Sequence, residues 1–509
     1  MTAPPDPRAP TLFWALFPIV ATLLLLTLQV FVFEGSPHVP LIFGVAMTAV
    51  IGRCFGLRWE AMQEGMVHAV ASAVPVIAIM LTVGMVIGTW ILSGTVPLLA
   101  WLGLQLLTPA IFLPATCIVC ALISVATGTS WGTVGTIGLA LIGIGESMAI
   151  PMPLTAGAIV SGAWFGDKLS PLSDSTNFAA AIAGVGIYAH IRNLLPTTLP
   201  AVAVALVAYA VLGAAYADAA IDHGRMDSLM TVLQAQFHFG GAIGLLVLLP
   251  PLVVMAMVFT RMPALPGIFA GVLAAGAVAM LVQDATLGEV MAVMMNGHVA
   301  TTGDALVDTL LTKGGLLSML WVVLLIMVAM AFGGVLERTG CFDTLLRAII
   351  PRLHTRFRLF AVCLLATFGI NTSSNIYVAL TVPGRMFAPV FRGMGYSATN
   401  LSRILEDGGT MTSPLIPWNP GGVFVSGTLG VPVLLYAPFA FANWLAILFD
   451  LLWSWLGVFT PRVGDAEFAD WHRRGDSLFH DGRFVLAAEL PGDFRSPAPQ
   501  PGALTPAIR

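Results

Sequence analysis

Charged side chains are what this sequence lacks most clearly. Only 9% of its 509 residues are Asp, Glu, Lys or Arg, against roughly 25% in an ordinary soluble protein. Hydrophobic residues make up 58% of the chain and gather in long runs such as Leu12–Phe33 and Leu316–Leu336. Runs of about 20 apolar residues are long enough to cross a bilayer as a helix. The sequence therefore predicts an integral membrane protein.

Cysteine is also scarce, and this excludes a disulfide framework. The five cysteines lie within or near apolar segments, and the pair Cys117 and Cys120 has no other metal-ligand spacing nearby. Buried packing is the common use of such cysteines. No Ser/His/Asp or metal-ligand constellation is present either, so we expect neither an enzyme nor a cofactor.

The apolar runs predict an all-α fold with about 10–12 transmembrane or re-entrant helices. Leu12–Phe33 is too long for a signal peptide and lacks a small-residue cleavage site, so we expect a first helix that is retained. The predicted divisions are an N-terminal cytoplasmic tail, two transmembrane halves and a polar cytoplasmic tail without a core of its own. Their bounds are 1–10, 11–235, 236–460 and 461–509.

Two short motifs recur at one separation along the chain. Thr-Ser occurs at 129 and again at 372, and Ser-Pro-Leu occurs at 170 and again at 413, so both recur after 243 residues. Weaker matches flank them at nearly the same separation. This agreement predicts that the two halves are repeats of one unit.

Arginine placement predicts that the two repeats are inverted. Thr95–Ala115, before the first motif, has no charged residue. Its counterpart carries arginines at 338, 347, 352, 356 and 358. By the positive-inside rule the counterpart is cytoplasmic and Thr95–Ala115 is not. Charges after the motifs place both ends of each motif segment on one side, which favours a re-entrant hairpin and leaves a broken helix as the alternative.

Four polar interruptions break the apolar pattern: Thr127–Thr133, Gly166–Asn177, Asn371–Asn375 and Glu406–Asn419. Irregular backbone survives within a bilayer only where it is buried in protein or lines a watery cavity. Inverted repeats with interrupted helices are the construction of secondary transporters, whose sites lie where the breaks meet. Packing of small hydroxyl residues between helices is the competing interpretation.

Carboxylates in two of the interruptions are the sharper signal. Asp167 and Asp174 flank Ser-Pro-Leu in the first half, and Glu406 and Asp407 precede it in the second. A charged side chain at mid-bilayer costs roughly 2.5–3.5 kcal/mol, so such groups are functional candidates. Burial disfavours the charged form of a carboxylate and a bound cation favours it. Such a site therefore holds either protons or a cation.

Salt bridges are the alternative interpretation of these carboxylates. Asp167 precedes Lys168, the only lysine before Lys313, but adjacent helical residues rarely face each other. A partner for Lys168 elsewhere in the fold is therefore expected. Glu406 and Asp407 could instead lie at the membrane edge and pair with Arg403.

The four interruptions resemble those of the NhaC family of sodium/proton antiporters, within the wider ion transporter superfamily. The segments that carry the resemblance are TGTSWGTVGT (127–136), GDKLSPLSDSTN (166–177), NTSSNIYVALTVPGRMF (371–387) and LSRILEDGGTMTSPLIPWNPGG (401–422). Ser175 stands where similar sequences are expected to have threonine, and the chain after Phe459 matches no pattern of the family.

The resemblance implies sodium efflux driven by proton influx, two-halved transport and a bacterial inner-membrane location. Together with the interruptions it assigns proton and cation exchange to Asp167, Asp174, Glu406 and Asp407. The predicted cation-coordinating residues are Thr129, Ser130, Ser170, Ser173, Thr176, Asn371, Thr372, Ser373, Thr410, Thr412 and Ser413. Similar proteins also exchange organic acids or amino acids, and this stays an alternative. Because the four interruptions contain no arginine, they favour a cation.

The expected partners are membrane lipid and the transported ions, not nucleic acid, and a homodimer stays open. Arg8 before the first helix, with Arg53 and Arg58 after the second, predicts a cytoplasmic N-terminus. A channel would conduct without counter-transport, and a scaffold would not need carboxylates inside the apolar region.

Overall fold

The structure is a computed structural model. It describes residues 9–33, 35–99, 108–171, 173–216, 235–238, 243–259, 262, 264–302, 308, 311–474, 476–480 and 483–486. Most of the predicted N-terminal tail, the expected boundary between the halves near 235 and the last 23 residues, 487–509, lie mainly or wholly outside these ranges.

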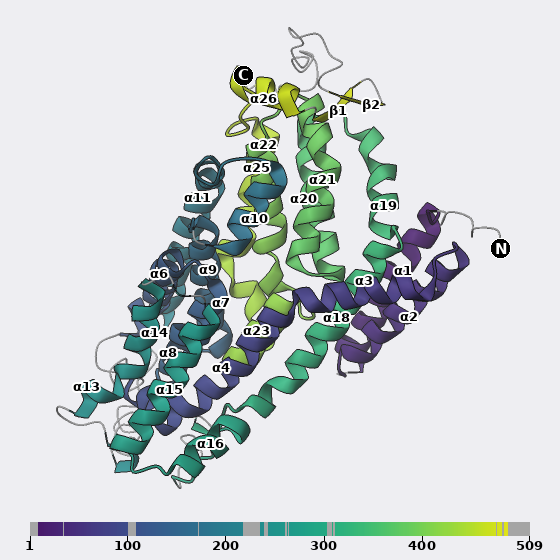
Figure 1. The fold of residues 1–509 in the computed structure, drawn as a ribbon. Coiled ribbons are helices and arrows are strands. Elements are labelled where there is room, and N and C mark those ends of the chain that lie inside the picture. Colours follow the sequence, from purple (N-terminus) through teal and green to yellow (C-terminus); the bar gives the residue numbers. More distant parts are fainter. Residues whose placement is uncertain are drawn as a thin grey trace.

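The described chain is almost entirely helical, as predicted (Figure 1). The first half contains α1 (Leu12–Thr27), α2 (His38–Cys54), α3 (Trp59–Ser72), α4 (Val74–Leu92), α6 (Pro109–Thr127), α7 (Ser130–Thr133), α8 (Leu139–Ser147), α9 (Met152–Leu169), α10 (Asp174–Ala183) and α11 (Ile187–Ala215). The second half contains α13 (Ile243–Val247), α14 (Leu249–Phe259), α15 (Ala264–Val282), α16 (Leu287–Asn296), α18 (Leu320–Arg338), α19 (Cys341–Ile349), α20 (Arg356–Ser373), α21 (Ile376–Gly393), α22 (Ala398–Leu405), α23 (Pro420–Leu429), α24 (Val433–Tyr436) and α25 (Phe441–Leu456). They are followed by α26 (Asp465–Arg474) and the antiparallel strands β1 (Ser477–His480) and β2 (Arg483–Leu486).

Helix lengths fit a membrane protein built from interrupted helices. Among the described residues, three helices are long and apolar enough to span a bilayer alone: Ile187–Ala215, Leu265–Val282 and Leu316–Arg338. A further pair, Ala398–Leu429 and Val433–Phe439, is bent by 91° at its break. The exposed hydrophobic side chains of α1, α2 and α11 lie where lipid is expected to cover them. The predicted all-α membrane fold is confirmed.

Helix bounds in the two halves correspond at a separation slightly larger than the motifs indicated. α4 begins at 74 and α18 at 320, α9 at 152 and α22 at 398, and α10 at 174 and α23 at 420, each 246 residues apart. The left-handed glycines that end α10 and α23, Gly184 and Gly430, keep this separation. The structural equivalent of Thr129 is therefore Asn375, and the predicted equivalence with Thr372 is wrong.

The separation of the motifs and that of the helix ends differ by three residues, and the difference arises next to Ser-Pro-Leu. In the first half, Ser-Pro-Leu begins only after the whole of α9, at 170. In the second half α22 is shorter and passes into a π-helical turn, Glu406–Thr410, so Ser-Pro-Leu begins three residues early. The longer link to α23 restores the register. The short motifs therefore recur after 243 residues, whereas the helix ends of the two halves recur after 246.

Inversion of the halves is visible in Figure 1. α4 descends toward α16 whereas α18 rises away from it, and α10 lies above the centre whereas α23 lies below. α20 and α21 contact each other, with their outer ends on one side (Figure 1). The two helices form a hairpin with its break at Ser374 and Asn375, and the position of this hairpin relative to the bilayer stays a prediction.

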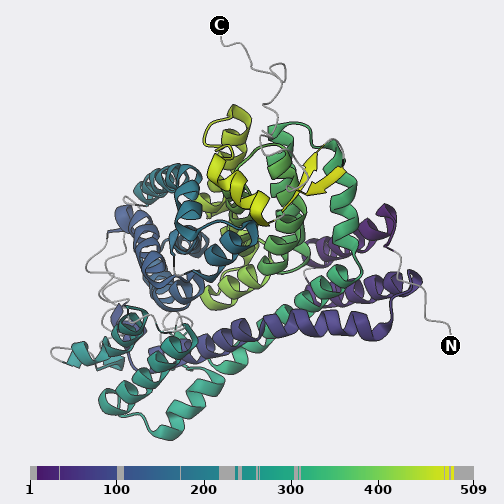
Figure 2. The same cartoon turned by 45° about the horizontal axis from the view of Figure 1, so that its top comes forward.

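The described part of the chain after α25, residues 457–474, 476–480 and 483–486, is folded and has a small core, which corrects the expectation of a tail without one. Trp471 and Leu478 are 1% and 0% exposed and pack with Val463 and Phe468. β1 contacts α21. Figure 2 shows this yellow C-terminal segment lying across the green helices. Its many polar residues concealed the few apolar ones that form this small core.

Polar contacts fasten this segment to the link between α21 and α22. Arg392, in the last turn of α21, pairs with Asp476 at 3.2 Å and lies 5.7 Å from the centre of the Trp471 ring. At the start of α22, the Ala398 amide donates to the Glu467 carboxylate at 2.8 Å. Both α21 and α22 are thereby joined to the C-terminal segment.

We predict that Trp471→Ala detaches the C-terminal segment. Removing a core tryptophan costs roughly 3–5 kcal/mol, and here it also takes away the ring beneath Arg392. Limited proteolysis of the purified protein in detergent should cut after α25 much faster than in the unaltered protein. Trp455→Ala, at an exposed position of α25, is the matched control. Equal cleavage rates for all three proteins would contradict this role of Trp471.

Candidate functional site

Local sequence explains why the helices break where they do. Ser170 has an extended backbone because Pro171 follows it, and a residue before proline is disfavoured in the helical region. Ser173 then caps α10 by accepting from the Thr176 amide. Thr129, Asn375 and Asn419 cap α7, α21 and α23 in the same way. Each break is thus a helix end closed by a short polar side chain.

Asp167 is a buried carboxylate near the end of α9. It is 4% exposed, and its Oδ2 accepts a hydrogen bond of 2.8 Å from the Ser130 hydroxyl. The other oxygen, Oδ1, makes no hydrogen bond of ordinary geometry to the described residues. Asp167 therefore joins two predicted interruptions of the first half and keeps one oxygen available.

Glu406 presents a second available carboxylate oxygen from the π-helical turn of the other half. Its side chain is fully buried, and Oε1 accepts from the Ser175 hydroxyl at 3.2 Å. Ser175 in turn lies 3.1 Å from the hydroxyl of Ser173. Glu406 Oε2 and the hydroxyl of buried Thr410 make no hydrogen bond of ordinary geometry within the described ranges, although the Thr410 hydroxyl lies close to the Glu406 carboxylate. Oxygen groups from both halves thus gather in one buried region.

Lys168 and Asp407 form a fully buried ion pair between the halves. The Thr197 hydroxyl lies 3.1 Å from the second oxygen of Asp407. The expectation that Lys168 finds its partner elsewhere in the fold is met by a residue 239 positions away. Asp407 was predicted as an exchange carboxylate beside Glu406, but in this conformation its charge is already balanced by an ammonium group.

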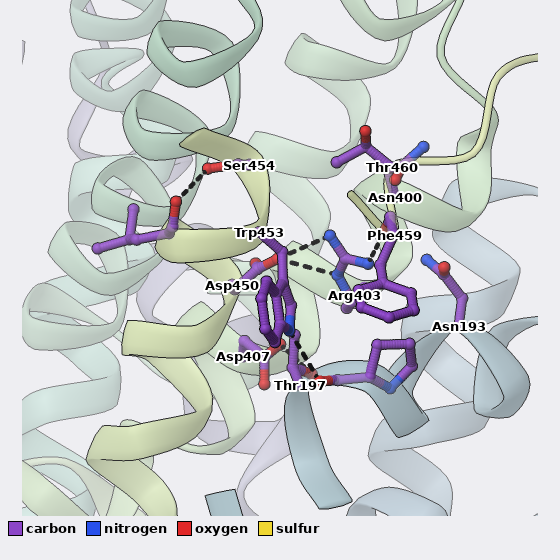
Figure 3. A network of polar contacts seen from close by, with 12 residues as sticks. Asn193, Thr197, Asn400, Arg403, Asp407, Asp450, Trp453, Ser454, Phe459 and Thr460 are labelled. Carbon is purple, nitrogen blue, oxygen red and sulfur yellow. Dashed lines mark hydrogen bonds and ion pairs between the residues drawn. The ribbon is translucent and has the colours of Figure 1, made fainter. Parts of the chain in front are cut away.

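A second buried ion pair stands nearby (Figure 3). Arg403 donates from Nε to Asp450 at 2.9 Å and from another nitrogen to the Phe459 carbonyl at 2.6 Å. The arginine is 0% and the aspartate 1% exposed. Arg403 is therefore not the partner of Glu406 or Asp407 that the alternative interpretation proposed, and these residues are buried rather than at a membrane edge.

Hydrogen bonds between Asn371 and Asn419 join the two breaks of the second half, and we call this contact the Asn371–Asn419 clasp. Asn419 Nδ2 donates to the Asn371 carbonyl at 2.8 Å and to its Oδ1 at 2.9 Å. Asn371 Nδ2 donates to the Gly409 carbonyl and to Thr412 Oγ1, and Ser413 donates to Asn419 Oδ1. The predicted cation ligands Asn371, Thr412 and Ser413 are therefore engaged with one another and with unwound backbone.

The other predicted hydroxyl ligands lie at helix ends and bond mainly to backbone. Thr372 and Ser373 donate to the Gly369 carbonyl, and Thr176 donates to the carbonyls of Asp167 and Lys168. The Thr129 side chain accepts from the Gly132 amide. Ser170 is buried, between α9 and the cap of α10. These groups shape the breaks, and the hydroxyls that also reach a carboxylate are those of Ser130 and Ser173 at Asp167 and of Thr410 at Glu406.

Asp174 occupies a different environment from Asp167. It is the first residue of α10 and is exposed, so the helix dipole favours its negative charge. Tyr377, near the start of α21, donates to Asp174 Oδ2 at 2.6 Å. Asp174 therefore lies at the exposed edge of the region whose buried centre contains Asp167 and Glu406, and we call this position the wet edge.

Sequence reasoning did not assign Ser175, Tyr377 or Asn419 to this site, and it expected a distant partner for Lys168 without identifying Asp407. A signal existed for Lys168, since it is the sole lysine in the first 312 residues and follows a candidate carboxylate. Asn419 also stands inside a quoted motif. Tyr377 stands inside a quoted motif as well, but nothing local indicated its partner Asp174, which lies 203 positions away.

We predict that Lys168→Met is strongly destabilising and that adding Asp407→Leu restores much of the stability. Removing one partner of a buried pair leaves an uncompensated charge and costs roughly 3–5 kcal/mol, whereas replacing both by apolar groups is often neutral. Thermal unfolding in detergent should rank the double variant above the single one. A double variant no more stable than Lys168→Met would contradict this view of the pair.

Comparisons with known proteins agree with this architecture. Residues 162–458 match the model of the Na+/H+ antiporter family. The chain is 37% identical over 432 residues to the Na+/H+ antiporter NhaC of Alkalihalophilus pseudofirmus, covering 84% of this chain and 92% of that protein. It is 34% identical to the arginine/ornithine antiporter ArcD of Halobacterium salinarum, covering 89% and 93%. It is also 34% identical to the malate-2H+/Na+-lactate antiporter of Bacillus subtilis, covering 89% and 96%. The chain belongs to the Na+/H+ antiporter family.

Proposed function

We propose that this protein exchanges Na+ for H+ across the membrane by alternating access. The observation that carries the proposal is the pair of buried carboxylates, Asp167 and Glu406, each with one oxygen that makes no hydrogen bond of ordinary geometry to the described residues. Hydroxyls of Ser130, Ser175 and Thr410 belong to the same region. Hard oxygen groups of this kind replace the water around a small hard cation.

Competition for these oxygens couples the two ions. A carboxylate buried in low dielectric is costly when charged and empty, so it takes up either a proton or a cation. Lys168 and Arg403 do not compete for Asp167 and Glu406, because each is paired with another carboxylate. Release of the proton on one side and of Na+ on the other then links the two gradients.

We propose that the protein lies in the bacterial inner membrane, as the family resemblance implies, and that both of its termini are cytoplasmic. The charge distribution supports the orientation. The arginines of the 338–358 region lie in and around α19, between α18 and the hairpin, and arginine-rich links favour the cytoplasmic side.

Exchange of an organic acid or amino acid is the second candidate, because two relatives are named for such substrates. A carboxylate substrate prefers an arginine or a helix N-terminus as its anchor. The buried arginine in this region, Arg403, already binds Asp450 and the Phe459 carbonyl. This arrangement favours a cation, and radiolabelled malate, lactate, arginine and ornithine would reveal the alternative.

We predict that Asp167→Asn and Glu406→Gln each abolish exchange. Both changes keep the size of the side chain but remove the charge that balances the cation. Collapse of an imposed pH gradient on addition of Na+ should be lost in proteoliposomes of either variant. Asp284→Asn is the matched control, since Asp284 is exposed, lies between α15 and α16 and has a left-handed backbone that asparagine accepts. Wild-type exchange in both variants would contradict the proposal.

Asp174→Asn discriminates between the two kinds of carboxylate. The sequence favours Asp174 as an exchange group, and loss of all exchange in this variant would support that role. If Asp174 serves only to attract or position the ion at the wet edge, the apparent KM for Na+ should rise while kcat is kept. The Na+ dependence of exchange, measured over a range of concentrations, separates these results.

A further inference from the structure

A cavity of about 760 Å³ lies outside the buried site, between α3, α18, α19 and α21. Its charged and titratable lining consists of Glu64, His68, Glu337, Arg338, Asp343 and Arg385. Glu64 and Arg338 approach each other at 3.8 Å, and both are largely exposed. With histidine neutral, the lining carries three negative and two positive charges. None of these residues belongs to the buried site of Asp167 and Glu406.

The wall contributed by α21 leads toward the wet edge of the site. Thr381 and Arg385 line the cavity, and Tyr377 precedes them by one and two helical turns. Residues four apart on a helix are neighbours on its surface. Because Tyr377 donates to exposed Asp174, the cavity wall and this carboxylate are linked along one stretch of α21.

Two adjacent glycines of α18 lie between the cavity and the break of the hairpin: Gly334 lines the cavity, and Gly333 contacts Ser374. A Cβ added at Gly334 would lie 2.4 Å from the Gly65 carbonyl of α3, and one added at Gly333 would lie 2.0 Å from Ser374 Oγ. Ser374 is buried at the tip of the hairpin, and its hydroxyl has no hydrogen-bond partner in the described part of the chain. At these glycines the backbone of α18 therefore lies directly against α3 on one side and against the Ser374 side chain of the break on the other.

We propose that this cavity is the aqueous route by which cations reach Asp174 and the hairpin break from one face of the membrane. The inference rests on the proposed exchange function. The Tyr377–Asp174 hydrogen bond stands at the inner end of the route, and Tyr377 is a positioning residue there. Glu337 and Asp343 raise the local cation concentration, since a charged cleft with low-dielectric walls focuses its field.

A labelling experiment tests the route without depending on transport. In a Cys54→Ser background, which removes the exposed cysteine, Asp174→Cys reacts with a positively charged, membrane-impermeant thiol reagent. Thr381→Trp is then added to fill the passage. We expect labelling of Asp174→Cys, followed by mass spectrometry, to become several-fold slower. Val299→Trp, at an exposed position after α16, is the matched control and should leave the rate unchanged.

The outcomes separate the route from the function. Equal labelling rates with and without Thr381→Trp, in proteins of equal melting midpoint, overturn the route even if the unaltered protein exchanges Na+ for H+. Slowed labelling together with an unaltered protein that fails to exchange the two ions supports the route and overturns the proposed function.

The carboxylates of the cavity have a test of their own. In an otherwise unaltered chain, Glu337→Gln and Asp343→Asn should together raise the apparent KM for Na+ several-fold at low ionic strength and leave kcat unchanged. The difference should shrink in high choline chloride, because salt screens exposed charges. A fall in kcat with unchanged KM would overturn the field-focusing role, and Asp284→Asn is again the control.

Discussion

Unwound backbone within a membrane must find hydrogen-bond partners inside the protein, and the rest of this structure depends on how that demand is met. Lipid offers no donors or acceptors, so each break needs its own polar groups. Here the breaks are closed by the caps Thr129, Ser173, Asn375 and Asn419 and by the Asn371–Asn419 clasp. Once these polar groups are present, the interior tolerates carboxylates that a continuous apolar helix would exclude.

Charge balance follows from the same constraint. The two basic groups near the breaks are each matched to one carboxylate, Lys168 to Asp407 and Arg403 to Asp450. The Lys168–Asp407 pair joins the two halves, and the Arg403–Asp450 pair joins α22 to α25 within the second half. Of the four buried carboxylates in this region, two are thus paired with a basic group, and the other two, Asp167 and Glu406, are the ones that we propose for ion exchange.

The sequence predicted the breaks well because their causes are local. Proline, glycine, serine and asparagine close to one another indicate a helix end whatever the tertiary fold, and all four predicted interruptions contain one. The partner of Lys168 could not be predicted, since ion pairing across 239 residues depends on packing. The true register between the halves was hidden by the π-helical turn at Glu406–Thr410, which shifts the motif by three residues but not the helix ends. The folded C-terminal segment was missed because two buried apolar residues, Trp471 and Leu478, carry its core.

The corrected register also bears on how many ion sites the two halves can form. At a separation of 246 residues, Asp167 and Lys168 correspond to Ser413 and Pro414, and Glu406 and Asp407 correspond to Val160 and Ser161. Each acidic group therefore has a neutral counterpart, although the backbone is repeated. Because the first half contributes Asp167 and the second contributes Glu406 from a different position, neither half holds a complete site. The repeated backbone supplies breaks in both halves, and the unlike side chains meet there in the single exchange site that we propose.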